Sequence, residues 1–383
     1  MESSCVNRVS ASVDETINRI GEFYKNNRRF CNVIFLLMVF VGIMIVRQGI
    51  VLNDELLNKA QREYGIINTI TSGIGNEMRM GRPLRILAAF NQTLGFIFKN
   101  IIASRTVQYC IVVLAFASAA WFTYALIGNK LFSFFVFILA LSLFPVTFEH
   151  TAPNAFNGLT LIPMLELNIS LVHWCRYLES RRKRNLILSI CLMLVALMGY
   201  EFMVTFLPLF LLIMLIKGKR ENKIKDLLKS LLPFVILGVA YVSGMLLLKY
   251  VVQGEYDGAT IGFVSINSSL KIVWTLFKSA IPGYWLLNGK YRFLYAYYSD
   301  TNRDLLLAIP VAVLFGFGIL YCFFHRKEDI DKKNPAMWLL YGMGGLIYAF
   351  IPSLPNSVAA MYQGNVTDDH FTALPVSPLR MIL

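Results

Sequence analysis

Residues 106–127 read TVQYCIVVLAFASAAWFTYALI, a run of 22 residues without Asp, Glu, Lys or Arg. An apolar stretch of about 20 residues matches the thickness of the hydrocarbon core of a bilayer. Because no water inside the bilayer can pair with backbone amides, such a stretch is expected to form a helix. Similar blocks recur along the 383-residue chain, of which 56% is hydrophobic and 15% charged. The sequence therefore predicts an all-α, polytopic transmembrane helical bundle.

The apolar blocks predict about nine spans within one integral membrane domain that covers residues 1–383. Residues 84–103 are apolar but interrupted by polar side chains, so we expect an interfacial or re-entrant helix there. Residues 186–216 are too long for one span and short for two, and basic clusters on both sides predict a helical hairpin with its turn at residues 199–201. The expected spans are 31–52, 106–127, 131–148, 158–174, 186–199, 202–216, 231–249, 305–324 and 336–351.

The distribution of lysine and arginine sets the expected orientation, because these residues concentrate in cytoplasmic loops. With the N-terminus inside, the inner segments hold 21 of the 36 Lys and Arg in 66 residues, whereas the outer segments hold 13 in 149. This pattern accounts for the net charge of +13 without a nucleic-acid partner. We therefore expect residues 1–30 to be a cytoplasmic tail and residues 53–105, 250–304 and 354–383 to be external loops, where chemistry can be housed.

Two short motifs in the first external loop are candidates for chemistry. Asp54 and Glu55 follow the first span, and adjacent carboxylates at the membrane surface suit a general base or a metal ligand. The alternative is an acidic first turn that complements a helix dipole. Arg82, between Gly81 and Pro83, is placed to bind phosphate, or to act as an anchor that reaches the lipid headgroups.

These motifs resemble those of the GT-C glycosyltransferases. The acidic pair after the first span, followed by Tyr64 and by the Gly-Arg-Pro-Leu at residues 81–84, is most similar to the bacterial glucosyltransferase family that modifies O-antigen and related surface glycans. Residues 355–362 and 374–376 are similar in placement. The resemblance implies a polyprenyl-phosphate-linked sugar donor, a glycan or lipid-linked acceptor, a membrane-lipid environment and the bacterial inner membrane, with the active face periplasmic.

Further residues are then expected to bind substrate. Glu149 fits the place where GT-C enzymes carry a second acidic motif, and His150 could assist in binding a metal or the acceptor. The alternative is that Glu149 and His150 are a surface pair at the end of a span. Lys278, Lys290 and Arg292 could neutralise a lipid phosphate. They lie in an external loop rich in aromatic residues, which suits stacking on sugar rings as well as an interfacial aromatic belt. We also count Tyr200, Glu201 and Tyr362 among the expected substrate-binding residues. If a divalent metal ion takes part, Asp54 and Glu149 are the candidate ligands.

The resulting hypothesis is an inverting hexosyltransferase in which Asp54 and Glu55 are catalytic. Asp54 would accept the proton of the acceptor hydroxyl, while Arg82 would stabilise the phosphate leaving group. A lipid-linked glycan polymerase or ligase would share this topology. A transporter or flippase would instead use Glu166 and His173, which lie seven residues apart on one face of a span and are ionisable groups at membrane depth.

Overall fold

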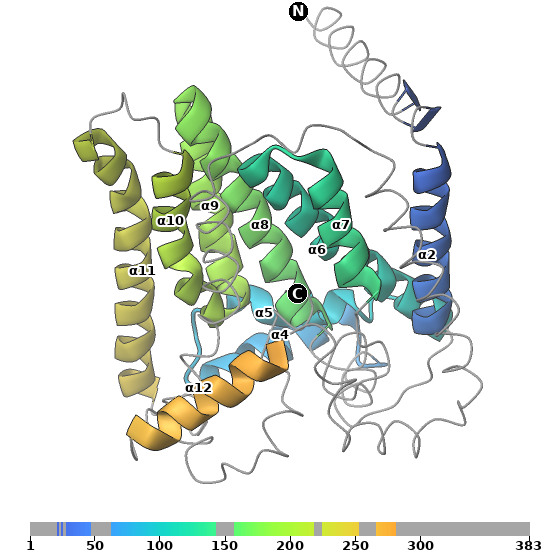
Figure 1. The fold of residues 1–383 in the computed structure, drawn as a ribbon. Helices are drawn as coiled ribbons and strands as arrows, with labels where there is room; N and C mark the ends of the chain where they lie inside the picture. Colours follow the sequence, from blue (N-terminus) through green and yellow to red (C-terminus); the bar gives the residue numbers. More distant parts are fainter. Residues whose placement is uncertain are drawn as a thin grey trace, which may run out of the picture. The chain divides into compact units, whose positions relative to one another are not determined.

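The computed structural model describes residues 21–22, 24–25, 28–46, 63–142, 157–217, 224–252 and 266–280. These residues are helical apart from short turns, and none of them forms a strand. The all-α fold class is therefore confirmed for the part of the chain that is described (Figure 1). The chain divides into two compact units, and the boundary falls within α2 (Arg28–Val46), after Phe40. All elements from α4 to α12 belong to the second unit.

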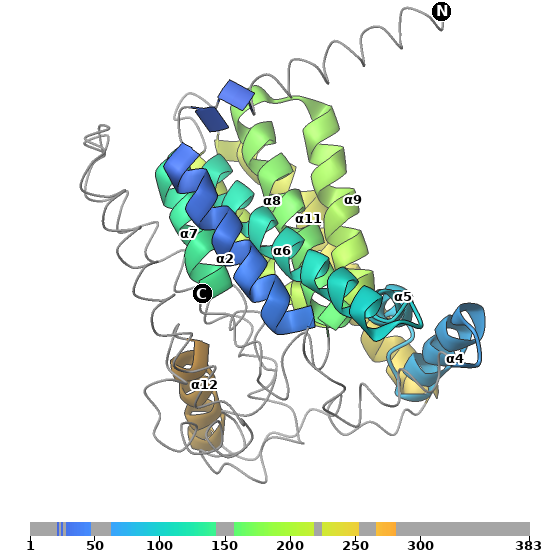
Figure 2. The same ribbon diagram turned by 90° about the vertical axis from the view of Figure 1, so that its right-hand side faces the viewer.

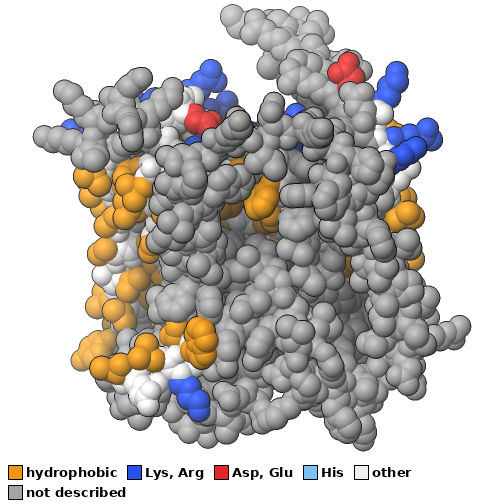
Figure 3. All heavy atoms as spheres, in the orientation of Figure 1, with side chains coloured by type: hydrophobic (Ala, Val, Ile, Leu, Met, Phe, Trp, Pro, Cys, Tyr) orange, Lys and Arg blue, Asp and Glu red, His pale blue; other side chains and the backbone are white. Residues whose placement is uncertain are grey.

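Three described helices are long and apolar enough to cross a membrane. They are α6 (Ile101–Ile127), α8 (Asn157–Ser180) and α11 (Ile224–Val252), with the apolar parts of the last two at 158–180 and 228–252. Figure 3 shows apolar side chains along α11, and Ile236, Val239 and Leu247 are more than half exposed, as expected of a surface that faces lipid. The membrane character is thus supported, while the count of about nine spans stays a prediction; the last two expected spans lie outside the described residues.

The helical hairpin predicted for residues 186–216 is confirmed. The first arm of the hairpin, α9, packs along α8, and Gly199 at the end of α9 lies against Pro163 near the start of α8. Tyr200 is extended, and the second arm returns so that Lys217 forms an ion pair of 2.7 Å with Glu179 at the other end of α8. The arms consist of α9 (Lys183–Gly199), the 3₁₀ helix η1 (Glu201–Phe206) and α10 (Leu207–Lys217).

The segment predicted to be interfacial forms a short helix that cannot span a bilayer. This helix, α5 (Ile86–Leu94), has 9 residues, or about 13 Å at 1.5 Å per residue. The chain then turns, and α6 begins at Ile101, five residues earlier than expected, because the side chain of Asn100 accepts hydrogen bonds from the first backbone amides of α6. Arg105, expected at the end of a loop, is instead buried in α6, where it donates to Gln108 at 2.7 Å.

Close backbone contacts fix α5 against α8 and α9. A side chain on Gly158 would overlap the carbonyl oxygen of Asn91, and a Cβ at Gly199 would lie 2.8 Å from Asn91 Nδ2. Glycine at these positions therefore allows the α5 backbone to approach the first turn of α8 and the last turn of α9. The amphipathic helix α4 (Ile66–Arg79) packs on α5, and both lie at the end of the bundle where α8 begins (Figures 1 and 2). The remaining described helices are α7 (Lys130–Ser142) and α12 (Ile266–Ala280).

Candidate functional site: a buried arginine–carboxylate cluster

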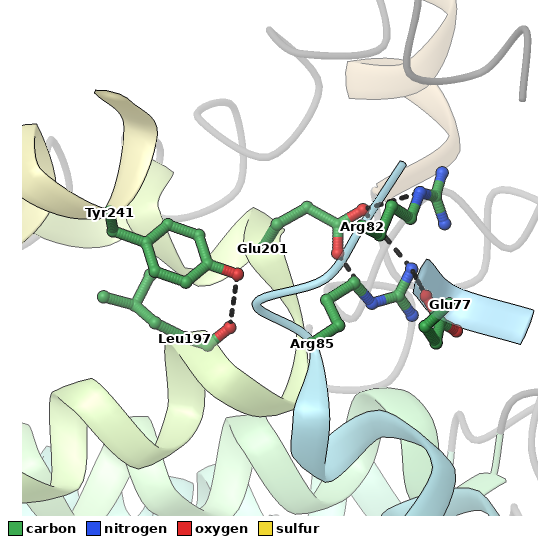
Figure 4. A network of polar contacts seen from close by, with 6 residues as sticks. All are labelled: Glu77, Arg82, Arg85, Leu197, Glu201 and Tyr241. Carbon is green, nitrogen blue, oxygen red and sulfur yellow. Dashed lines mark hydrogen bonds and ion pairs between the residues drawn. The ribbon is translucent and has the colours of Figure 1, made fainter. Parts of the chain in front are cut away.

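Four charged residues from three segments meet beside the turn of the α9–α10 hairpin, and we call them the arginine–carboxylate cluster. Glu77 belongs to α4, Arg82 and Arg85 to the loop between α4 and α5, and Glu201 to the first position of η1. Figure 4 shows the Arg85 guanidinium beside the carboxylates of Glu77 and Glu201, with the Nε of Arg82 directed toward Glu201. Because Glu201 is more than a hundred residues from the other three, only the tertiary fold brings them together.

The local structure of residues 77–85 explains why the two arginines lie close to Glu77. Helix α4 ends at Arg79 with Met80 as its C-cap, and Gly81 has a φ of 74°, a left-handed conformation that favours glycine. The amide of Arg82 donates to the carbonyl of Glu77 at 2.9 Å, and the amide of Gly81 donates to Met78 at 3.0 Å. This is the Schellman hydrogen-bond pattern of a helix end, and a proline shortly after it is common. Gly81 and Pro83 thus stop the helix and return Arg82 to the last turn of α4.

Arg85 is the centre of the cluster, and its side chain is only 1% exposed. Its Nε lies 2.9 Å from Glu201 Oε2, and its Nη1 lies 3.4 Å both from Glu201 Oε1 and from Glu77 Oε2. The guanidinium also lies over the ring of Tyr200, 5.1 Å from its centroid. Arg85 therefore contacts both carboxylates and an aromatic face, a combination that suits the planar, delocalised guanidinium group.

Arg82 occupies the outer side of the cluster. Its side chain is 14% exposed, and its Nε approaches Glu201 Oε1 at 3.6 Å, the longest of the arginine–carboxylate contacts described here. The terminal nitrogens of Arg82 point away from the Glu201 carboxylate in Figure 4. Arg82 is thus the cluster member whose guanidinium is best placed to meet an anion from outside.

Burial and charge act in opposite directions on these groups. Burial raises the pKa of Glu77, and Glu201 raises it further, while Arg85 and Arg82 lower it; the net direction is upward. Burial lowers the pKa of the Arg85 guanidinium, but Glu201 and Glu77 together raise it above its ordinary value. Arg85 therefore stays charged, and the cluster contains two positive groups facing two carboxylates.

A tyrosine from α11 closes the inner side of the cluster. The hydroxyl of Tyr241 donates to the backbone carbonyl of Leu197, in the last turn of α9, at 2.8 Å. Figure 4 shows this bond beside Glu201. Tyr200, which follows α9, stacks on Phe202 with 5.0 Å between ring centroids. These contacts fix the end of α9, and hence the start of η1, where Glu201 is presented.

Of the residues predicted from the sequence to form a site, Arg82, Tyr200 and Glu201 are brought together. Glu77 and Arg85 were not predicted. The sequence feature that could have identified Arg85 is its place as a charged residue at the edge of an apolar segment. Glu77 has the sequence context of an ordinary solvated residue in an amphipathic helix. Seven other predicted site residues lie outside the described part of the chain: Asp54, Glu55, Glu149, His150, Lys290, Arg292 and Tyr362. Lys278 lies in the described helix α12, but its side chain is outside the description.

The structure describes the ionisable pair of α8, Glu166 and His173, but not the two predicted metal ligands. Asp54 and Glu149 lie outside the described residues, and within the described ranges no group of three or more His, Cys, Asp or Glu is arranged to hold a metal ion. His173 Nδ1 lies 3.4 Å from Asn185 Oδ1 on α9. Glu166 Oε2 is buried and has no hydrogen-bond partner among the described residues.

Comparisons with protein families, with curated proteins and with solved structures found no match to this chain. The resemblance to GT-C enzymes therefore rests on the short motifs in the sequence. The cluster geometry is an independent observation from which a function can be argued.

Proposed function

We propose that this chain is a membrane glycosyltransferase of the GT-C type. It transfers a hexose from a polyprenyl-phosphate carrier to a surface glycan or lipid-linked acceptor on the external face, with inversion at the anomeric carbon. The observation that carries the proposal is the ion pair of Arg82 with Glu201, beside Tyr200, whose ring lies under Arg85. The sequence motifs had singled out Arg82, Tyr200 and Glu201 for substrate binding. A shared site is what one donor molecule requires, and residues with unrelated structural roles need not converge.

The chemistry assigned to the cluster is charge stabilisation of the leaving phosphate. As the glycosidic bond breaks, negative charge builds up on the phosphate oxygens, and a guanidinium held in place stabilises that charge without rearranging. Arg82 makes this contact, since its terminal nitrogens point outward from the cluster. Arg85 is too deeply buried to reach a ligand, with 1% of its side chain exposed, and it holds Glu201 in position.

The catalytic base belongs to the first external loop in this proposal. Asp54 accepts the proton of the acceptor hydroxyl while its oxygen attacks the anomeric carbon, and such general base catalysis contributes about 10²–10⁴ in rate. Glu55 and Glu149 orient the acceptor or hold a divalent ion. The phosphate leaves with the electron pair of the glycosidic bond, so the step needs no separate general acid.

Two other functions are kept because each makes a distinct prediction. A lipid-linked glycan polymerase or ligase uses the same cluster but a donor that carries an oligosaccharide. A transporter or flippase is favoured by one observation, the buried carboxylate oxygen of Glu166 without a hydrogen-bond partner among the described residues of the bundle. Ionisable groups at this depth in a candidate span commonly mark transport pathways.

The test is sugar transfer by the purified protein in lipid nanodiscs. The donor is polyprenyl-phosphate-linked glucose with a radioactive sugar, and the acceptor is an O-antigen extract. We expect Asp54→Asn to abolish transfer and Arg82→Gln to reduce it by at least tenfold. Glu63→Gln is the matched control, because it removes the same charge from an exposed carboxylate that contacts Lys99, outside the cluster, at 3.6 Å.

The outcomes separate the three functions. Transfer of single sugars that is lost in Asp54→Asn but kept in Glu63→Gln supports the proposal. Transfer only from oligosaccharide carriers indicates the polymerase or ligase. Movement of the lipid-linked sugar across the bilayer of sealed proteoliposomes without transfer, lost in Glu166→Gln and kept in Asp54→Asn, would overturn the glycosyltransferase proposal in favour of a flippase.

A further inference from the structure

The two carboxylates of the cluster compete for one arginine. Arg85 Nη1 lies 3.4 Å from Glu77 Oε2 and 3.4 Å from Glu201 Oε1. Glu201 has a second partner in Arg82, at 3.6 Å, whereas Glu77 forms its ion pair with Arg85. When Glu77 interacts strongly with Arg85, less of the positive charge of Arg85 is available to Glu201. Arg82 then has to balance more of the negative charge of Glu201.

This sharing has a consequence for any anion that reaches Arg82. Within the four residues of the cluster, two guanidinium groups face two carboxylates before the anion binds. A bound phosphodiester adds one negative charge, which repels both carboxylates in a half-buried environment where such repulsion is costly. That repulsion is relieved if one carboxylate loses its charge.

We infer that Glu77 limits the affinity of Arg82 for a phosphate group, because it competes with Glu201 for Arg85 and so keeps the charge of Glu201 on Arg82. The inference rests on the phosphate site proposed above and assigns Glu77 as a residue that sets affinity without touching the ligand. When Glu77 is neutral, Arg85 balances Glu201 alone, and Arg82 engages the phosphate.

Glu77 is also the carboxylate best suited to become neutral. The charged groups that act on it are Arg82 and Arg85 from the α4–α5 loop and Glu201 from η1, and burial together with Glu201 raises its pKa. Among the residues that the structure describes, Tyr241 of α11 is a further titratable neighbour, and a tyrosine carries no charge near neutral pH. A phosphate at Arg82 adds a further negative charge, which moves the pKa of Glu77 upward again. Phosphate binding is therefore coupled to proton uptake, and affinity rises as the pH falls.

The test measures equilibrium binding of polyprenyl-phosphate-linked glucose in nanodiscs, without acceptor. This donor is a phosphodiester, so its own charge stays constant between about pH 5 and about pH 8, and any pH dependence belongs to the protein. Glu77→Gln should tighten binding about tenfold at the higher pH, the effect of removing one charge about 10 Å away at an effective dielectric constant of about 20. Wild-type affinity should rise toward that of Glu77→Gln as the pH is lowered.

Two further variants make the result specific. Glu77→Asp keeps the charge and should keep the pH dependence, while Glu63→Gln removes an exposed charge outside the cluster and should change neither affinity nor pH dependence. A purely structural role for Glu77 predicts the opposite sign, because Glu77→Gln would then loosen the loop and weaken binding. Weaker or unchanged binding by Glu77→Gln overturns the inference, as does a wild-type affinity that does not rise at low pH.

The proposed function can fail separately. If Arg82→Gln leaves donor binding unchanged at every pH, the phosphate site itself is wrong, and the role of Glu77 falls with it. If Arg82→Gln weakens binding but Glu77→Gln does not tighten it, the phosphate site stands and only the inference about Glu77 is refuted.

Discussion

Replacing Arg85 with methionine tests whether the cluster holds the fold together. Methionine has a comparable volume and an apolar stem like that of arginine, but it leaves Glu77 and Glu201 facing each other without their shared counter-charge. At an effective dielectric constant of about 20, two unit charges about 4 Å apart interact by about 4 kcal/mol. Arg85 contacts two carboxylates, while its own desolvation opposes that gain. Removing one member of a buried ion pair typically destabilises by about 3–5 kcal/mol, and we expect a loss in this range for Arg85→Met.

The pH dependence of this loss has a defined sign. Arg85 lowers the pKa of Glu77, so its removal leaves a carboxyl group whose pKa in the folded state is raised even further. A group of this kind stabilises the fold below its unfolded pKa, and that contribution is lost as the pH rises through the folded value. The destabilisation of Arg85→Met relative to the wild type should therefore be largest at about pH 8 and shrink toward about pH 5.

The free energy of unfolding is measured by denaturant titration of the protein in mixed micelles, followed by intrinsic fluorescence. Arg176→Met is the control, because Arg176 is exposed and lies over the ring of Trp121 at 5.1 Å. An exposed cation–π contact of this kind is worth about 0.5–1 kcal/mol. A loss for Arg85→Met no larger than that of the control, or a loss that grows as the pH falls, would refute the reasoning.

Three other predictions follow from single features of the fold. Gly158→Ala places a side chain on the carbonyl oxygen of Asn91 and should lower the free energy of unfolding by about 1–3 kcal/mol in the same titration. Gly75→Ala is the control: nothing lies within 4 Å of the added atom, so it should be neutral or stabilising by up to about 1 kcal/mol. Trp174→Phe removes a hydrogen bond of 2.9 Å from the indole to a carbonyl of α10 and should cost about 1 kcal/mol, seen as a lower denaturant midpoint with an unchanged slope. A cysteine introduced at Lys59 should react with an impermeant thiol reagent from outside the cell, and labelling only from the cytoplasm would reverse the expected orientation.

The sequence alone predicted the features that depend on local pattern. Continuous apolar blocks indicate helices and membrane burial, since nothing else satisfies the backbone in lipid. The basic clusters on both sides of residues 186–216 predicted a hairpin, and the structure reverses at Tyr200 as expected. The polar residues within 84–103 predicted an interfacial or re-entrant helix in place of a span, and α5, which ends at Leu94, is too short to cross a bilayer.

The tertiary structure decided which charges meet. Arg82 and Glu201 were singled out separately, but no spacing in the sequence indicates that an α4 carboxylate reaches both through Arg85. Glu77 has the sequence context of a solvated helix residue, and only the packing of α4 and α5 beside the end of α9 buries it. A buried ion pair depends on the positions of several backbones at once, and residues more than a hundred positions apart acquire those positions only when the helices pack.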